Sequence, residues 1–164
     1  MTFAAPSFEH KICAPGELRQ RLERVPRPLV FTNGVFDILH RGHVTYLAQA
    51  RALGASLIVA LNSDDSVRRL GKGEERPVNN LHDRAAVLAA LESTDLVTWF
   101  EEDTPLALIR EIGPDVLVKG GDWPVQDIVG AAEVSARGGT VHSIPFVHER
   151  STTALLEKIR DPRA

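Results

Sequence analysis

The sequence predicts an α/β protein: a three-layer sandwich in which helices cover both faces of a mostly parallel five-stranded sheet. Two observations predict it. Short apolar runs alternate with helical segments along the whole chain, which is the pattern of parallel strands joined by crossover helices. Polar clusters follow several of the apolar runs directly, as ligand-binding loops do at the carboxyl ends of parallel strands.

Length and composition predict one soluble domain. The chain has 164 residues, of which 43% are hydrophobic and 25% charged, enough for a substantial core. The formal net charge of −3 argues against a general nucleic-acid binder, which is usually basic. A single cysteine, Cys13, excludes an intrachain disulfide and a cysteine-based zinc site, and we expect an uninvolved thiol near a loose terminus. Without a membrane-length apolar run or a signal-peptide core, we expect a cytoplasmic protein with no membrane partner.

The N-terminal region is expected to be peripheral. Residues 1–14 show no clear periodicity and are expected to be a tail. A short helix should follow Pro15, because Leu18, Leu22 and Val25 fall on one helical face. We therefore divide the chain into an N-terminal tail with a short helix, residues 1–27, and a main domain, residues 28–164.

The main domain contains the alternating elements. Helix starts and ends are marked by residues such as Thr104-Pro105 at a start and Gly113-Pro114 at an end. The glycine- and proline-containing stretch 68–80 is expected to be a loop. The inward positions of the helix over 83–91 should include Val87, Leu88 and Leu91. Apolar runs predict strands at 29–31, 57–61, 96–100, 116–118 and 141–144, and periodicity and caps predict helices over 43–53, 83–91, 104–112 and 126–137 and after 151.

The stretch between the first strand and the following helix carries the strongest functional signal. It places His40 and His43 around Gly42 at a helix N-terminus, where backbone N–H groups bind phosphate. Two imidazoles there can stabilise charge on a phosphoryl group in transfer, and Gly42 lets a ligand approach the backbone. Asp37 would orient a histidine or an ammonium group. The structural alternatives are helix capping by the histidines and an N-cap role for Asp37.

Other polar clusters should meet at the same edge of the sheet. Ser151, Thr152 and Thr153, with Arg150 before them, predict a second phosphate cradle, or else an ordinary N-cap. Lys72 would fold over a triphosphate, or else be a surface lysine. Lys119, Gly120, Asp122 and Trp123 follow a strand and would lie near a base or a second substrate; the alternative for Trp123 is buried packing. Asn62, Asp64 and Arg84 complete the set, and a surface position is the alternative for Arg84.

The pattern G-x-F-D-x-x-H-x-G-H, from Gly34 to His43, resembles the signature of the HxGH, cytidylyltransferase-like nucleotidyltransferase superfamily, whose domain is Rossmann-like. The further runs Arg76-Pro77-Val78-Asn79 and Lys119-Gly120-Gly121-Asp122 look like the branch that makes ADP-heptose from heptose 1-phosphate. The likeness covers roughly residues 28–160. It implies transfer of AMP from ATP to D-glycero-β-D-manno-heptose 1-phosphate, with release of pyrophosphate, for lipopolysaccharide core biosynthesis.

The resemblance also implies roles and partners. Mg²⁺ is expected to travel with ATP, with no metal site made by the protein alone. The sugar phosphate should come from a separate heptose kinase, because no kinase sequence is present, and relatives are commonly dimers or larger. No nucleic-acid partner is implied. The implied site residues are His40, His43 and Lys72 for catalysis; Thr32, Asn33, Gly34, Val35, Phe36, Asp37, Gly42, Lys119, Gly120, Arg150, Ser151, Thr152 and Thr153 for nucleotide and phosphate; and Asn62, Asp64, Arg84, Asp122 and Trp123 for the second substrate.

Several alternatives stay open at this point. A cytidylyltransferase acting on glycerol 3-phosphate or a similar alcohol phosphate, or a guanylyltransferase acting on the α-heptose phosphate, would have the same fold. Relatives acting on glycerol phosphate often carry an arginine where this chain has Phe146, Val147 and His148, which leaves Arg150 as a substitute. A non-catalytic nucleotide sensor and a fragment of a class I aminoacyl-tRNA synthetase are more distant alternatives.

Overall fold

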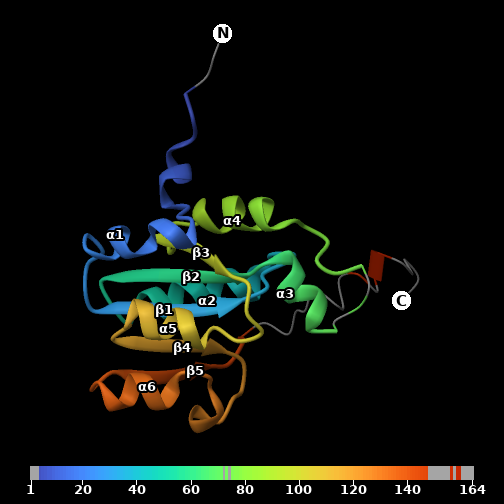
Figure 1. Ribbon diagram of the computed structural model, residues 1–164. Helices are drawn as coiled ribbons and strands as arrows, with labels where there is room; N and C mark the ends of the chain where they lie inside the picture. The colour runs from blue at the N-terminus through green and yellow to red at the C-terminus, as the bar shows by residue number, and fades with distance from the viewer. Residues whose placement is uncertain (1–3, 72, 74, 148–155, 157, 160–164) are drawn as a thin grey trace.

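The computed structural model describes residues 4–71, 73, 75–147, 156, 158 and 159. Its centre is a five-stranded sheet in which every neighbouring pair of strands is parallel. The strands are β1 (Leu29–Gly34), β2 (Ser56–Asn62), β3 (Leu96–Phe100), β4 (Val116–Gly120) and β5 (Thr140–Ile144), in the spatial order β3-β2-β1-β4-β5 (Figure 1). The predicted α/β fold is therefore confirmed. The strand order reverses between β1 and β4, the place where such sheets bind ligands.

Helices cover both faces of the sheet. The structure contains the α-helices α1 (Leu18–Leu22), α2 (Arg41–Arg51), α3 (Asp64–Arg69), α4 (Leu81–Ala89), α5 (Leu106–Ile112) and α6 (Ala131–Ala136), and the 3₁₀ helices η1 (Ser7–Lys11), η2 (Pro15–Glu17) and η3 (Val125–Asp127). Residues of α1, α5 and α6 share one core cluster with Phe31, whereas α2 and α4 share the other with Val30. Because side chains alternate along a strand, β1 contributes to both clusters.

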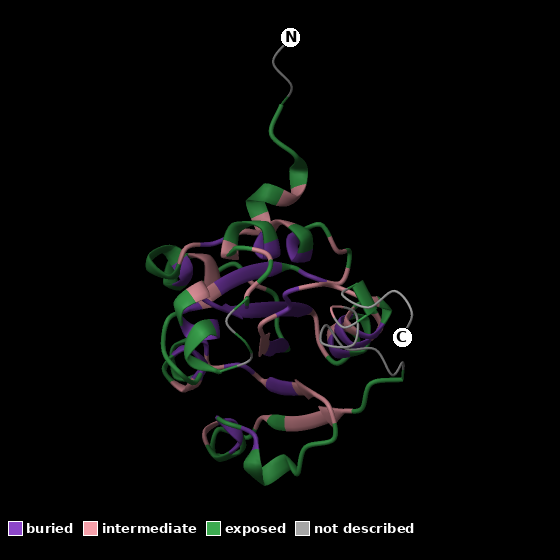
Figure 2. Ribbon diagram, turned by 90° about the vertical axis from the view of Figure 1, so that its right-hand side faces the viewer, coloured by how far each residue is buried: buried purple, intermediate pink, exposed green. Residues whose placement is uncertain are grey.

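The central strands are buried on both faces. All seven residues of β2 are buried, as expected for a central parallel strand covered on both faces. Figure 2 shows the buried residues concentrated in the central strands and in the helix faces that meet them. The strands of Figure 1 end on the side where α3 lies, so their carboxyl ends form one edge with α3 beside it.

The N-terminal residues pack more closely than the sequence predicts. Cys13 is fully buried in the cluster shared with α5, and its backbone N–H donates to the Val97 carbonyl at 2.9 Å. Ile12 forms an isolated parallel bridge with Val97. The expectation of a loose terminus around Cys13 is wrong, because this pairing with β3 anchors the segment; that the thiol is uninvolved stays a prediction. The face formed by Leu18, Leu22 and Val25 is confirmed.

Other local expectations need correction. The stretch 68–80 was expected to be a loop, but its first two residues belong to α3. This helix begins at Asp64, and Ser63 caps it by accepting from the Ser66 N–H. Val87 is 52% exposed, so only Leu88 and Leu91 of the three predicted inward residues pack on the core. The helix predicted over 126–137 is divided into η3 and α6. Among the helices of the described part of the chain, none is long and apolar enough to cross a membrane.

Candidate active site

The two histidines of the motif lie together at the start of α2. His40 occupies the N-cap position in an extended conformation, and its carbonyl accepts from the His43 N–H at 2.9 Å. The two imidazole rings are stacked, with 3.9 Å between centroids and 20° between planes. The first backbone N–H groups of a helix have no partner within the helix and favour anions. The rings and the helix N-terminus therefore form one corner whose donors suit a phosphate, and we call it the candidate phosphate-binding corner.

A strained turn presents this corner. Phe36 has φ of +47°, a left-handed conformation that is uncommon for a bulky residue and typical of functional turns. Its ring contacts His43 edge to face, with 5.3 Å between centroids. Gly34 is needed behind it, because a Cβ at that position would lie 2.9 Å from the Phe36 ring. The turn thus fixes His43 from the side of β1.

The environment of His43 keeps its imidazole neutral near pH 7. Burial, and secondarily the charge of neighbouring His40, lower the pKa of His43 to about 4. Its Nδ1 atom is buried and has no hydrogen-bond partner within the described part of the chain. A neutral imidazole retains one N–H donor, which can point at a phosphate oxygen. An incoming phosphate would oppose the depression of the pKa by supplying negative charge.

A buried tyrosine joins α2 to the point where the strand order reverses. The Tyr46 hydroxyl pairs with Thr32 of β1 and also donates to the Val118 carbonyl of β4 at 3.3 Å. Burial raises the pKa of Tyr46 far above its ordinary value, so it remains protonated. Phe146 contacts both Tyr46 and His43 edge to face, at centroid distances of 5.7 and 6.2 Å. Gly120 permits this packing, since a Cβ there would lie 2.8 Å from Phe146.

Asp37 holds the loop that follows α3. Its carboxylate accepts from the backbone N–H groups of Val78 and Asn79, at 3.0 and 2.9 Å. The same carboxylate lies 2.6 Å from Nε of Arg76, and the two side chains are 0% and 8% exposed. Asp37 does not cap α2, since His40 occupies the N-cap position, so the predicted N-cap alternative is wrong. Its contacts couple the histidine loop to the 76–79 loop.

Arg84 extends the same coupling from α4. Its side chain is completely buried and forms a 2.6 Å ion pair with Asp64. Its guanidinium also donates to the carbonyls of Val35, Asn62 and Asn79, at 2.8, 2.9 and 3.0 Å. The expected alternative of a surface position for Arg84 is wrong. Arg84 therefore binds groups from the loop after β1, the end of β2, the start of α3 and the loop before α4. These contacts favour a positioning role for both Arg84 and Asp64.

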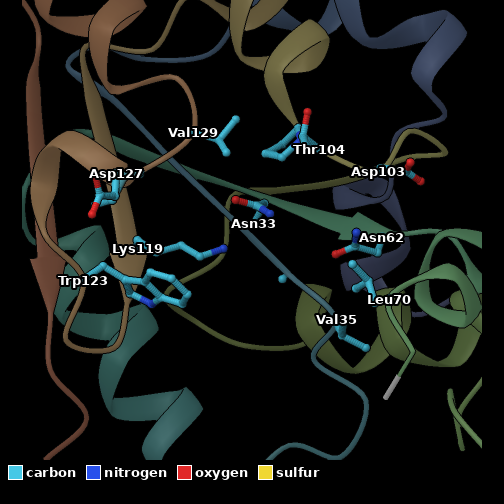
Figure 3. Close-up of a pocket in the computed structure, with 13 residues that line it drawn as sticks. Asn33, Val35, Asn62, Leu70, Asp103, Thr104, Lys119, Trp123, Asp127 and Val129 are labelled. Carbon is cyan, nitrogen blue, oxygen red and sulfur yellow. The ribbon is translucent and has the colours of Figure 1, made fainter. Parts of the chain in front are cut away.

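A cavity of about 310 Å³ opens beside this framework (Figure 3). In the figure the side chains of Asn33, Asn62 and Lys119 point towards it from the ends of β1, β2 and β4. Trp123 lies beside Lys119, is 51% exposed, and donates from its indole N–H to the Gly120 carbonyl at 3.2 Å. Trp123 is therefore not buried in packing. The lining residues are Asn33, Gly34, Val35, Asn62, Leu70, Asp103, Thr104, Pro105, Lys119, Trp123, Asp127, Ile128 and Val129.

The other predicted site residues are distributed as follows. Phe36 contacts the His43 ring, and Gly34 leaves room for Phe36. Thr32 pairs with Tyr46, and Gly42 is buried in α2 between the two histidines. Asp122 is exposed and does not line the cavity. Among the described residues, no group of three His, Cys, Asp or Glu side chains could hold a metal ion. Five predicted residues lie outside the described residues: Lys72, Arg150, Ser151, Thr152 and Thr153.

Several residues of the site were not singled out from the sequence. Thr104 was interpreted as the N-cap of a helix, but Pro105 occupies that position; its place after β3 was the available signal. Tyr46 lies four residues after Gly42 and three after His43, a spacing that puts it on the same helix face as His43. Asp127 in η3 had no local signal, because its approach to the cavity depends on long-range folding.

Comparisons with known proteins agree with this geometry. Residues 31–156 match the family model described as cytidylyltransferase-like. A protein of Bordetella bronchiseptica named D-beta-D-heptose 1-phosphate adenylyltransferase is 61% identical over 93% of this chain and 96% of its own length. The bifunctional protein HldE of Marinomonas is 58% identical over 79% of this chain, and the match spans 27% of that protein. A solved structure titled lipopolysaccharide core biosynthesis protein, from Thermoplasma volcanium, has a TM-score of 0.61 at 28% identity, covering 74% of this chain and 98% of its own.

Proposed function

The chain belongs to the cytidylyltransferase-like family, and from that premise we propose that it transfers AMP from ATP to D-β-D-heptose 1-phosphate, giving ADP-heptose and pyrophosphate. The high identity to a protein of that name, over nearly the full length of both chains, supports this choice within the family. The match to 27% of the bifunctional protein HldE shows that a similar domain also forms part of a longer protein.

The stacked pair of His40 and His43 at the N-terminus of α2 is the observation that carries the proposal. Transfer of a nucleotidyl group requires donors for the charge that develops on the α-phosphate, and it requires little covalent chemistry from the protein. The neutral His43 imidazole and the backbone N–H groups at the start of α2 supply such donors. The pair stands beside the strand-order reversal, with Lys119 on the adjacent strand end.

The reaction is an in-line displacement. An oxygen of the sugar phosphate attacks the α-phosphorus of ATP, a new P–O bond forms, and the bond to the pyrophosphate leaving group breaks. A phosphate monoester is already a competent nucleophile, so no protein base is needed. The protein contributes orientation and charge stabilisation: His40 and His43 hold the reacting phosphate, while the contacts of Tyr46, Asp37 and Arg84 fix the loops around them.

The cation and the remaining phosphate contacts are part of the proposal. Triphosphate chemistry uses Mg²⁺, which prefers oxygen ligands, but the described residues offer no cluster of three acidic or histidine ligands for it. Mg²⁺ is proposed to enter with ATP and to neutralise charge on the phosphates. Lys72, Arg150, Ser151, Thr152 and Thr153 are proposed to bind the β- and γ-phosphates. A separate kinase is proposed to supply the sugar phosphate, and a homo-oligomer is proposed in solution.

Pyrophosphate release tests the proposal. The wild-type protein would be incubated with Mg²⁺, one of ATP, CTP or GTP, and one of β-heptose 1-phosphate, its α-anomer or glycerol 3-phosphate. We expect release only with ATP and the β-heptose phosphate. Release only with another pair would reassign the substrates while keeping the chemistry. Binding of nucleotide without release for any pair would favour a sensor and contradict the proposal.

A further inference from the structure

The cavity of Figure 3 has a chemical character that the phosphate-binding corner does not explain. None of its lining residues is His40 or His43. It is bounded by the segment before α5, which carries Thr104, and by η3, which ends at Asp127. Both α5 and Ile128, which follows η3, pack in the core cluster on one face of the sheet, whereas α2 packs in the cluster on the other face. The cavity and the histidine pair therefore flank the end of β1 from opposite faces.

Three polar side chains around the cavity have hydrogen-bonding capacity to spare. Asn33, Thr104 and Asp127 come from three different elements, and no hydrogen bond of their side chains is found within the described part of the chain. Asn62, by contrast, donates to Ser66 at 3.0 Å, which fixes its amide with one face towards the cavity. Polar groups that converge on a concave site without protein partners are the groups that orient a ligand.

The position of Thr104 is fixed from α3. Ser66 donates to the Glu102 carbonyl at 2.9 Å, and Arg69 forms a 2.7 Å ion pair with Asp103. Arg69 also donates to the Glu101 carbonyl. Three contacts from α3 therefore hold residues 101–103, immediately before Thr104. A pocket wall built in this way keeps its shape without a ligand, which lowers the entropic cost of binding.

On these observations we propose that the cavity is the binding pocket for the heptose ring of the acceptor, with Asn33, Thr104 and Asp127 as specificity-determining residues that bind its hydroxyl groups. This inference rests on the proposed function. Carboxylate and amide oxygens accept hydrogen bonds from sugar hydroxyls. A heptose ring carries several hydroxyls, each a donor and an acceptor, whereas adenine offers a single exocyclic amine as donor, so polar side chains from three separate elements suit the sugar better than the base. The exposed Trp123 ring offers an apolar surface to the C–H face of a sugar.

Lys119 connects this pocket to the reacting phosphates. Its side chain points into the cavity beside Asn33 (Figure 3). An ammonium group there would bind the 1-phosphate of the sugar, leaving the ring towards Thr104 and Asp127. The attacking oxygen would then approach the α-phosphorus from the cavity face, opposite to a pyrophosphate held at the α2 face, as an in-line displacement requires. The volume of about 310 Å³ lies at the small end of the range for ligand pockets, about 300–1,000 Å³.

Two substitutions and two ligands test the pocket. Asp127→Asn and Thr104→Val keep the shape of each side chain while removing a charge or a hydroxyl. We expect KM for β-heptose 1-phosphate to rise about 10-fold or more in the first and roughly 3- to 10-fold in the second, with KM for ATP within about 2-fold of wild type. Glu111→Gln, on the exposed side of α5, and Thr140→Val, at the opposite end of the sheet, are the matched controls and should behave like wild type.

A second substrate distinguishes recognition of hydroxyls from general damage. D-Mannose 1-phosphate lacks the last carbon and hydroxyl of the heptose. If the pocket reads hydroxyls, at least one of the two variants should lower the kcat/KM preference for heptose over mannose phosphate. A rise in KM for ATP alone would assign the cavity to the nucleotide and overturn the inference. Unchanged KM values for both substrates in both variants would also overturn it.

The same experiment separates the two proposals. If the wild-type protein does not turn over β-heptose 1-phosphate, calorimetry measures binding of that compound and of a non-hydrolysable ATP analogue to wild type and variants. Binding weakened by Asp127→Asn for the sugar alone would retain the pocket and reject only the proposed reaction. Absence of sugar binding to the wild type would reject both. Normal turnover by the wild type, together with unchanged KM values in the two variants, would reject the pocket alone.

Discussion

Replacing Arg84 by methionine tests whether one buried cation holds the loops of the site. The substitution keeps much of the side-chain volume but removes the 2.6 Å ion pair with Asp64 and the hydrogen bonds to three carbonyls. Hydrogen bonds to a charged group contribute about 1.5–3 kcal/mol each, and breaking a buried ion pair costs about 3–5 kcal/mol. The contributions are not additive, and the Asp64 side chain is 27% exposed, so its carboxylate regains water. We expect a loss of about 3–5 kcal/mol in the free energy of unfolding.

Denaturant unfolding followed by tryptophan fluorescence measures this loss, and Arg110→Met is the matched control. Arg110 forms an ion pair of nearly the same length, 2.7 Å, with Glu133, but its side chain is 61% exposed. Exposed pairs contribute about 0–1 kcal/mol, so the control should lose no more than that. Equal losses in the two variants would refute the argument from burial. Arg84→Lys, which keeps the charge but cannot serve all four acceptors, should fall between wild type and Arg84→Met.

Three further predictions concern His43 and the contacts of Asp37 with the 76–79 loop. His43→Ala should lower turnover in the pyrophosphate assay by about 100-fold or more, as loss of a transition-state donor does, with little change in thermal unfolding; near-normal turnover would contradict the role of His43. Because the pKa of His43 is depressed to about 4 in the folded protein, the unfolded chain takes up its proton first as pH falls. Wild type should therefore lose on the order of 1–2 kcal/mol of stability between about pH 6.5 and pH 4, after a discount for solvent screening, that His43→Ala does not lose; parallel stability profiles of the two proteins would exclude this. Asp37→Asn should weaken the hold on the 76–79 loop, and faster amide exchange at Val78 and Asn79, with unchanged exchange in β2, is the expected result.

The sheet and the histidine pair were predictable because their signals are local. Apolar runs such as Leu57 to Leu61 fall on buried strands, and the spacing of His40 and His43 places them at one helix start. What the sequence did not reveal depends on contacts between distant segments. Cys13 is buried because Ile12 pairs with Val97, and Asp37 meets Arg76 only after the chain has passed through α2, β2 and α3.

The candidate site divides in the same way. The pattern around Gly34 and His43 could be interpreted from residue types and spacing, since the phosphate-binding corner is built within one strand–turn–helix unit. The cavity is assembled from the ends of β1, β2 and β4 with segments before α5 and around η3. The three strand ends were expected to meet at this edge of the sheet, but no periodicity or motif marks the segments before α5 and around η3, so Thr104 was interpreted as a cap and Asp127 was not noticed. Arg84 was selected, but its burial and its four partners were not predictable.

The proposed ligand sites on the two faces of β1 give a physical reason for the chemistry to lie at this point of the fold. A displacement at phosphorus needs the nucleophile and the leaving group on opposite sides of the reacting atom, and a single strand end with ligand sites on both faces provides that separation. The Tyr46 hydroxyl binds groups of both β1 and β4, and Arg84 binds the loop after β1 together with the end of β2. These two braces fix the strand ends that carry Asn33, Asn62 and Lys119 relative to the histidines. In the proposed arrangement, these buried contacts set the distance from the acceptor pocket to the phosphate corner, and a fixed distance between the reacting groups is what positioning catalysis requires.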